Sequence, residues 1–143
     1  MLLVLVTGMP VILLNMLLQS WVAVCCIRFY TKRFHYKEGV IAGALALFGI
    51  ILIVLLGNLL QIMLWGILFL FLLLGEFSTL HEAVYHSGVN FATLGYGDIV
   101  MSAKWKLLGP LEAVNGALMI GLSGASMLAV LQHHIRKQIG DFK

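Results

Sequence analysis

The sequence predicts an all-α membrane protein with three transmembrane helices. Of its 143 residues, 62% are hydrophobic and only 10% are charged, whereas soluble domains are roughly half apolar and about one-quarter charged. The mean hydropathy is +1.04. The apolar residues stand in long runs and do not alternate with polar ones, which favours helices over a β-barrel. The composition therefore indicates an integral membrane protein.

The first apolar run covers residues 2–27 and exceeds the roughly 20 residues that a helix needs to cross the hydrocarbon core. It lacks a basic start and a small-residue cleavage site, so we expect a retained helix and not a signal peptide. Pro10 predicts a kink in this helix. Asn15, Gln19 and Ser20 predict a face that packs against protein.

The second apolar run, residues 40–74, is too long for a simple crossing. At 1.5 Å per residue its roughly 35 residues would make a helix of about 52 Å, against a core of about 30 Å. One crossing requires a tilt, a bend near Gly57 and Asn58, or a packed extension beyond the membrane. A hairpin that turns at Gly57 and Asn58 would give four crossings in all. We favour one crossing, because two residues make a very short turn.

Basic residues predict the orientation. One cluster follows the first run and another follows the third run, residues 107–131: Arg28, Lys32, Arg33 and Lys37, then Arg136, Lys137 and Lys143. The positive-inside rule places both clusters in the cytoplasm. We therefore expect a multi-pass protein of the cell membrane with its N-terminus outside and its C-terminus in the cytoplasm, and anionic lipids at the basic clusters. Nucleic acid and small-molecule substrates are not expected partners.

A short segment, residues 80–92, lies between the second and third runs. Its dozen residues cannot cross a membrane but suit a half-helix that enters it. Ser78 or Thr79 can cap the start, and Glu82 falls in the first turn, where a carboxylate suits the helix dipole.

The six residues that follow, Thr-Leu-Gly-Tyr-Gly-Asp at 93–98, resemble the selectivity filter of potassium channels, usually Thr-Val-Gly-Tyr-Gly-Asp. Such a filter replaces the hydration shell of K⁺ with rings of backbone carbonyls. Gly95 and Gly97 permit the left-handed backbone that turns successive carbonyls towards one axis. A chance match in a soluble turn is disfavoured by the apolar runs on both sides.

The resemblance implies a role for each residue of this segment. It places K⁺ at Thr93, Leu94, Gly95 and Tyr96, with the Thr93 hydroxyl as a further ligand at the inner mouth. Leu94 and Tyr96 would point away from the ions and brace the strand. Asp98 would place a carboxylate at the outer mouth, where it concentrates cations. Because one chain supplies a quarter of each ring, the resemblance implies a homotetramer around a central pore.

The resemblance divides the chain into two parts. Residues 1–38 would form a peripheral transmembrane helix and a basic loop. Residues 39–143 would form a pore domain with an outer helix, a re-entrant pore helix at 80–92, the filter at 93–98, an inner helix at 107–131 and a short basic tail. We expect a potassium channel without enzymatic activity, with K⁺ as permeant ion and no cofactor.

The segment before the filter departs from the family pattern. An aromatic pair and a Ser or Ala are usual there, and Tyr85, His86 and Ser87 occupy those places. Two threonines usually precede the filter, but Ala92 replaces the first. A weakly selective cation channel, and a non-conducting subunit that joins a true channel, therefore remain alternatives.

In the inner helix, Gly116 and Gly121 resemble the hinge and packing glycines of two-helix channels. Close helix packing would explain them equally well. The expected phase of the helix gives an apolar cavity wall: Ala117, Ile120, Gly124 and Leu128.

Several polar residues leave two interpretations open. Glu112 and Asn115 lie deepest in the third run, and an intramembrane carboxylate is a functional candidate. Glu112 either hydrogen-bonds the pore helix or faces ions. His133 and His134 either sense cytoplasmic pH or anchor the helix at headgroups. The spacing of His81 and His86, and of His133 and His134, does not favour a metal site.

Overall fold

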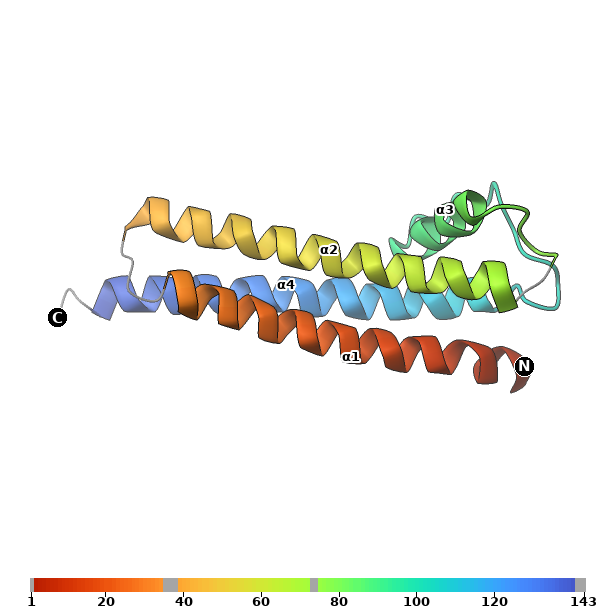
Figure 1. Ribbon diagram of the computed structural model, residues 1–143, viewed down its shortest axis with the longest axis horizontal. Coiled ribbons are helices and arrows are strands. Elements are labelled where there is room, and N and C mark those ends of the chain that lie inside the picture. The colour runs from red at the N-terminus through yellow and green to blue at the C-terminus, as the bar shows by residue number, and fades with distance from the viewer. Residues whose placement is uncertain (1, 35–38, 73–74, 141–143) are drawn as a thin grey trace.

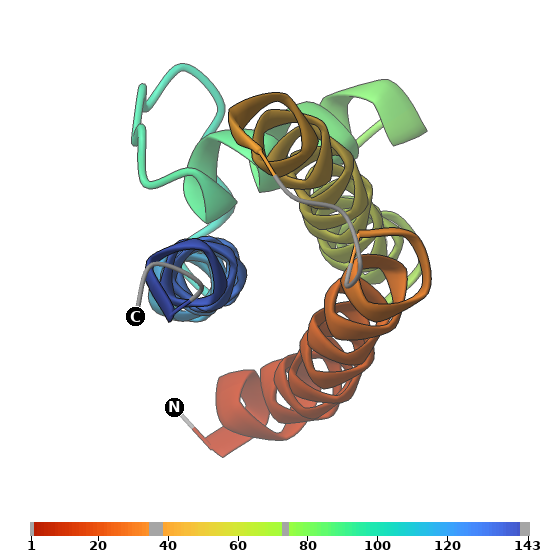
Figure 2. The same ribbon diagram turned by 90° about the vertical axis from the view of Figure 1, so that its left-hand side faces the viewer.

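Three long helices and one short helix make up the fold. The computed structural model describes residues 2–34, 39–72 and 75–140. The helices are α1 (Leu2–Arg33), α2 (Val40–Leu72), α3 (Leu80–Phe91) and α4 (Leu108–Gly140). The three long helices lie side by side, with α3 at the end that holds the N-terminus (Figure 1). Seen along the bundle, α1 and α3 flank the α2–α4 pair on opposite sides (Figure 2).

The three long apolar helices predicted from the sequence are present. Each long helix contains a segment that is long and apolar enough to cross a membrane: Leu2–Arg33, Val40–Phe71 and Leu108–Arg136. Two helices run past the apolar runs that predicted them, α1 to Arg33 and α4 to Gly140. The helix continues into the polar residues because the backbone hydrogen bonds of a helix do not depend on whether the side chains are apolar.

The hairpin alternative for residues 40–74 is wrong. α2 is one continuous helix of 33 residues, or roughly 50 Å at 1.5 Å per residue. Gly57 lies inside it, at a crossing with α1, where an added Cβ would stand 2.6 Å from Val22 Cγ2. Gly57 therefore permits close helix approach and does not form a turn. The other two long helices have nearly the same length, 32 residues in α1 and 33 in α4, so all three extend together along the bundle.

Apolar side chains pack in two clusters along the bundle. One lies beneath α3 and includes Trp65, Phe69, Phe91, Leu108 and Met119. The other lies towards the opposite end and includes Val22, Cys26, Ile50, Val54 and Val130.

Buried amides connect α1 to the other two long helices. Asn15 Nδ2 donates to Asn115 Oδ1 over 2.7 Å, and Trp65 Nε1 donates to the same oxygen over 3.0 Å. Such bonds hold helices together in lipid, where apolar burial alone does not. They confirm the protein-packed face expected at Asn15. Pro10 lies inside α1, which runs through it as one continuous helix.

A second group of amides lies one turn further along α1. Gln61 Nε2 donates to Gln19 Oε1 over 2.9 Å, and Gln19 Nε2 donates to Ser123 Oγ over 3.1 Å. Gln19 thus also faces protein, as expected. Ser20 does not, because its exposed hydroxyl bonds to the Met16 carbonyl of its own helix.

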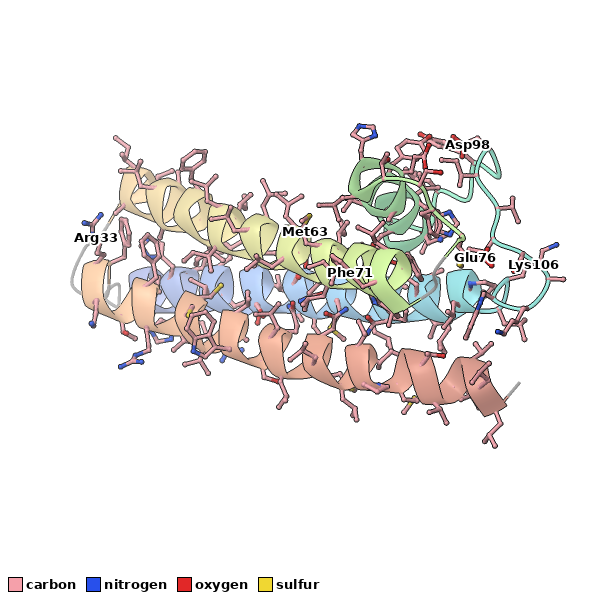
Figure 3. All side chains as sticks on the ribbon, turned by 45° about the vertical axis from the view of Figure 1, so that its right-hand side comes forward. Arg33, Met63, Phe71, Glu76, Asp98 and Lys106 are labelled. Carbon is pink, nitrogen blue, oxygen red and sulfur yellow. The ribbon has the colours of Figure 1, made fainter. Side chains whose placement is uncertain are left out.

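Charged residues gather at the two ends of the bundle. Arg33 lies at one end, whereas Glu76, Asp98 and Lys106 lie at the other (Figure 3). The last turns of α4 lie at the same end as the last turns of α1, which ends at Arg33 (Figure 1). The described members of the two basic clusters, which are Arg28, Lys32, Arg33 and Arg136, therefore lie towards one end of the bundle, while the side of the membrane stays a prediction. Several positions named from the sequence lie outside the described residues: Lys37, Lys143, the boundary at residue 38 and the side chain of Lys137.

His134 ties the C-terminal part of α4 to the α1–α2 end. It is buried, its Nε2 lies 3.3 Å from the Gly39 carbonyl oxygen and its Nδ1 lies 3.1 Å from the Tyr30 hydroxyl. His133 is exposed and packs edge-on against Tyr30. This placement gives His134 a packing role, and the pH-sensor role stays a prediction.

Candidate functional site

Helix α3 begins with a reciprocal cap. The Glu82 backbone N–H donates to Thr79 Oγ1 over 3.2 Å, and the Ser78 backbone N–H donates to Glu82 Oε2 over 3.1 Å. Of the two predicted caps, Thr79 is the one used. The helix ends at Phe91 with Ala92 as its C-cap, within one residue of the predicted range.

Two glycines allow α3 to lie very close to its neighbours. A Cβ on Gly66 of α2 would stand 2.7 Å from Val84 Cγ2 and 3.0 Å from Val84 Cα. A Cβ on Gly116 of α4 would stand 2.1 Å from the carbonyl oxygen of Phe91, the last residue of α3. Gly116 therefore occupies a close contact between two backbones, the packing role that the sequence left open.

The segment after α3 alternates in backbone conformation. Thr93, Gly95 and Gly97 have φ angles of 58°, 60° and 72°, whereas Leu94 and Tyr96 have none in this positive range. The left-handed conformation expected at Gly95 and Gly97 is present. Thr93 was not expected to share it, since a β-branched residue is strained there. Every second residue from 93 to 97 is thus left-handed.

No residue of this segment is buried within the single chain. Residues 93–98 are all exposed, Leu94 to 55% and Tyr96 to 66%. A Cβ added at Gly95 or Gly97 would meet nothing within 4 Å. The bracing expected from Leu94 and Tyr96 is therefore not supplied by their own chain.

The C-terminal end of the segment is hydrogen-bonded to α3. Tyr85 Oη donates to Asp98 Oδ2 over 2.6 Å, and the Ile99 backbone N–H donates to Asp98 Oδ1 over 3.0 Å. The bond from Tyr85 lowers the pKa of the Asp98 carboxyl below its ordinary value and raises that of the Tyr85 phenol.

A histidine forms a second tie one residue further on. His86 Nδ1 lies 3.1 Å from the Ile99 carbonyl oxygen, and Asn90 Nδ2 lies 2.8 Å from His86 Nε2. Both bonds form when the neutral ring carries its proton on Nδ1, which donates to the carbonyl, while Nε2 accepts from the amide. Burial lowers the pKa of His86, so the neutral ring is favoured.

A third tie joins the loop to the chain before α3. Glu76 accepts from the Ser102 backbone N–H over 2.7 Å and from the Ser102 hydroxyl over 2.5 Å. Sequence reasoning did not predict these contacts of Glu76, His86 and Asn90. The contacts Tyr85–Asp98 and His86–Ile99 share a spacing of 13 residues. This spacing predicts contacts only once α3 is known to lie along the loop.

The expected cavity wall of α4 is exposed in the single chain. Ala117, Ile120, Gly124 and Leu128 are all exposed and share one face at helical spacing. Gly121 is also exposed, and a Cβ there would meet nothing within 4 Å. Glu112 and Asn115 point elsewhere, because both are buried against other helices.

The comparison with family models agrees with this geometry. Residues 58–133, more than half of the chain, match the model of a family described as ion channel. The chain belongs to this ion channel family. The match includes the second half of α2, α3, the 93–98 segment and most of α4, and it leaves out α1. Searches of curated proteins and of solved structures each found no match.

In this ion channel protein, Tyr85→Phe is expected to make function more sensitive to acid. A depressed pKa keeps Asp98 ionised until the pH falls through that lowered value, and the stabilising contribution of its carboxylate is lost only there. Without the phenol, the pKa of Asp98 returns towards its ordinary value, so the carboxylate is lost at a higher pH. Ion flux measured against external pH should therefore fall at a higher pH in the variant.

The control for this experiment is Asp98→Asn. In that background, Tyr85→Phe should produce no further shift of the pH profile. An equal shift with and without Asp98 would contradict the assignment of the effect to this hydrogen bond.

Proposed function

We propose that this ion channel protein conducts K⁺ passively and selectively through a tetrameric pore. The observation that carries the proposal is the exposed 93–98 segment with left-handed backbone at Thr93, Gly95 and Gly97. In an extended chain, alternation between left- and right-handed residues turns successive carbonyls towards one side. Stacked carbonyl rings are the ligands that replace the hydration shell of K⁺.

Each part of the proposed pore has a physical role. The carbonyls of Thr93, Leu94, Gly95 and Tyr96 bind K⁺, and Asp98 attracts cations to the outer mouth. Helix α3 acts as a re-entrant pore helix whose carboxyl end carries partial negative charge towards the ions. The apolar face of α4 with Ala117 and Ile120 lines the cavity, where it binds no ion tightly. No enzymatic activity or cofactor is needed for this passive conduction.

Two exposed surfaces of the single chain support the proposed tetramer. Residues 93–98 are all exposed, and so are the four residues of the proposed cavity face of α4. Four copies around one axis would close each carbonyl ring and cover Leu94 and Tyr96 with neighbouring chains.

Crosslinking of the detergent-solubilised or reconstituted protein is expected to give a ladder that ends at four chains. The closed ring follows from the need for four carbonyls at each level of the filter. A ladder that ends reproducibly at two or three chains, with no larger assembly by light scattering, would contradict the proposal.

The proposed orientation places the Arg33 end in the cytoplasm, where anionic lipids would contact its basic residues, and the filter end outside. Ser78 and Thr31 are exposed near opposite ends of the bundle. In a background without Cys25 and Cys26, an impermeant thiol reagent added outside should label a cysteine at Ser78 and not one at Thr31. Labelling of the cysteine at position 31 alone would show that the orientation is the reverse of the proposed one.

Flux from liposomes tests the function itself. We expect rapid flux with K⁺ as the only permeant cation and little with Na⁺. Equal flux of both ions would favour the weakly selective alternative, to which the Ala92 departure points. No flux of either ion from tetrameric, correctly inserted protein would favour the non-conducting subunit.

A further inference from the structure

Three helices meet at one buried hydroxyl group. Ser87 Oγ, on α3, lies 2.8 Å from the backbone carbonyl oxygen of Ile62 on α2 and 2.5 Å from Glu112 Oε1 on α4. Ser87 and Glu112 are both fully buried, at 0% exposure. The contact lies within the segment of α4 that is long and apolar enough to cross a membrane.

The number of protons at this contact identifies the state of Glu112. A serine hydroxyl has one proton and can donate to one acceptor. The Ile62 carbonyl accepts only, and an ionised carboxylate also accepts only. With an ionised Glu112, one of the two close oxygen–oxygen contacts would have no hydrogen between its atoms. With a neutral carboxylic acid, Glu112 donates to Ser87 Oγ, and Ser87 donates to the Ile62 carbonyl.

Ser123 Oγ also lies close to two acceptor oxygens, but there the second hydrogen bond can form without an added proton. Ser123 Oγ lies 2.9 Å from the Met119 carbonyl oxygen and 3.2 Å from Asn58 Oδ1. If the nitrogen and oxygen of the Asn58 amide exchange places, the amide N–H donates to Ser123 Oγ, without any change of charge. A carboxyl group has no such choice and needs a proton.

The surroundings of Glu112 also oppose a charge. Its second oxygen, Oε2, is buried without a hydrogen-bond partner among the described residues. α2 contains no titratable side chain, and α1 contains none before Cys25. On α3, Asn90 interacts with both His86 and Glu112, and no charged group among the described residues interacts with Glu112. On the chain before α4, Lys106 is exposed. A buried carboxylate without a cation or a full set of donors is strongly disfavoured.

We propose that Glu112 is a buried proton-binding site that holds the channel helices together as a neutral acid. Through its O–H group it positions α3 against α4, and Ser87 passes the hydrogen bond on to α2. Gly116, one turn along α4, contacts the end of α3 at Phe91. These two contacts fix the helix that carries the 93–98 segment. The proposal does not depend on which ion the channel selects.

Infrared spectroscopy of the reconstituted full chain at pH 7.5 tests the protonation directly. The wild type should show the carbonyl stretch of a protonated carboxylic acid, shifted in D₂O, and Glu112→Gln should lack it. The other five acidic residues are the internal control, since ordinary carboxyl groups are ionised at this pH. Absence of the band from the wild type, or a band of equal strength in Glu112→Gln, would overturn the proposal.

Conservative rescue provides an independent measurement. The amide side chain introduced by Glu112→Gln can still donate an N–H to Ser87, whereas the thioether introduced by Glu112→Met cannot. We expect the unfolding temperature of Glu112→Gln to stay close to that of the wild type and that of Glu112→Met to be lower by about 4 °C or more. In a Ser87→Ala background this difference between the two variants should nearly vanish.

The outcome of this rescue separates the two charge states. If Glu112→Gln lowers the unfolding temperature as much as Glu112→Met does, a carboxylate is required and the neutral acid is excluded. Should the Glu112→Met variant fail to fold, the infrared comparison of wild type and Glu112→Gln still decides.

Discussion

Gly95→Ala is expected to abolish K⁺ flux while leaving a protein that inserts and assembles. Gly95 has a φ of 60°, a conformation that costs an L-residue roughly 1–2 kcal/mol. Nothing lies within 4 Å of the added Cβ in the single chain, so the expected effect comes from the backbone and not from a clash. Four chains would carry the same strain at one ring of carbonyls. The backbone would relax towards negative φ and turn carbonyls away from the ions.

The matched control is Gly88→Ala. Gly88 lies inside α3, and a Cβ there would meet only Ile62 Cγ2, at 3.9 Å, an ordinary contact. In a helix interior alanine is favoured over glycine by about 1 kcal/mol. We therefore expect Gly88→Ala to keep its K⁺ flux and to be slightly more stable. If Gly95→Ala conducts as the wild type does, residues 93–98 are not the filter.

The sequence was sufficient to predict the long helices. Unbroken apolar runs allow only helices in lipid, because every backbone group must find its partner within the same segment. The start of α3 was also predictable, since Thr79 and Glu82 make a local cap that depends on neighbouring residues alone. The C-terminal ends of α1 and α4 were harder to predict. The polar turns up to Arg33 and Gly140 continue the same backbone hydrogen bonds, and the apolar pattern gives no signal of where the helix stops.

Residues whose partners lie far along the chain could not be predicted in the same way. Glycine in an apolar run suits a turn, a hinge or a close contact, and only the neighbours separate these cases. Gly57 is close to Val22, and Gly116 is close to Phe91. His86 gains its role from the Ile99 carbonyl, which no residue type reveals. The left-handed Thr93 follows from the path of the backbone and not from its own preference.

Of the candidate site, the sequence was sufficient to identify residues 93–98 as the proposed filter, but not the residues that support them. Its six residues are contiguous, and their chemistry is local. The ties at Asp98, Ile99 and Ser102 join positions that are 13 or 26 residues apart. The alternation of the backbone agrees with the carbonyl chemistry that the motif implies, whereas the selected ion and the number of chains stay predictions.

Gly116→Ala is expected to be the most destabilising of the glycine substitutions in α4. Its Cβ would stand 2.1 Å from the Phe91 carbonyl oxygen and 2.7 Å from the carbonyl carbon. Both belong to backbone, which cannot turn aside as a flexible side chain would. Helix α4 must move away from the end of α3, and overpacking of this kind costs roughly 1–3 kcal/mol. Because Phe91 stands two residues before Thr93, the shift should also displace the filter and lower K⁺ flux.

Gly121→Ala separates packing from hinge motion on the same helix. Gly121 is exposed, and a Cβ there meets nothing within 4 Å, so its unfolding temperature should equal or exceed that of the wild type. Thermal unfolding in detergent, followed by flux from liposomes, measures both variants. Loss of stability at Gly116 with none at Gly121 establishes the close contact at Phe91. If Gly121→Ala keeps its stability but changes open probability, Gly121 acts as a hinge.

A Gly116→Ala protein as stable and as conductive as the wild type would contradict the close contact. It would show that α4 and the end of α3 lie further apart than the 2.1 Å between the added Cβ and the Phe91 carbonyl oxygen implies.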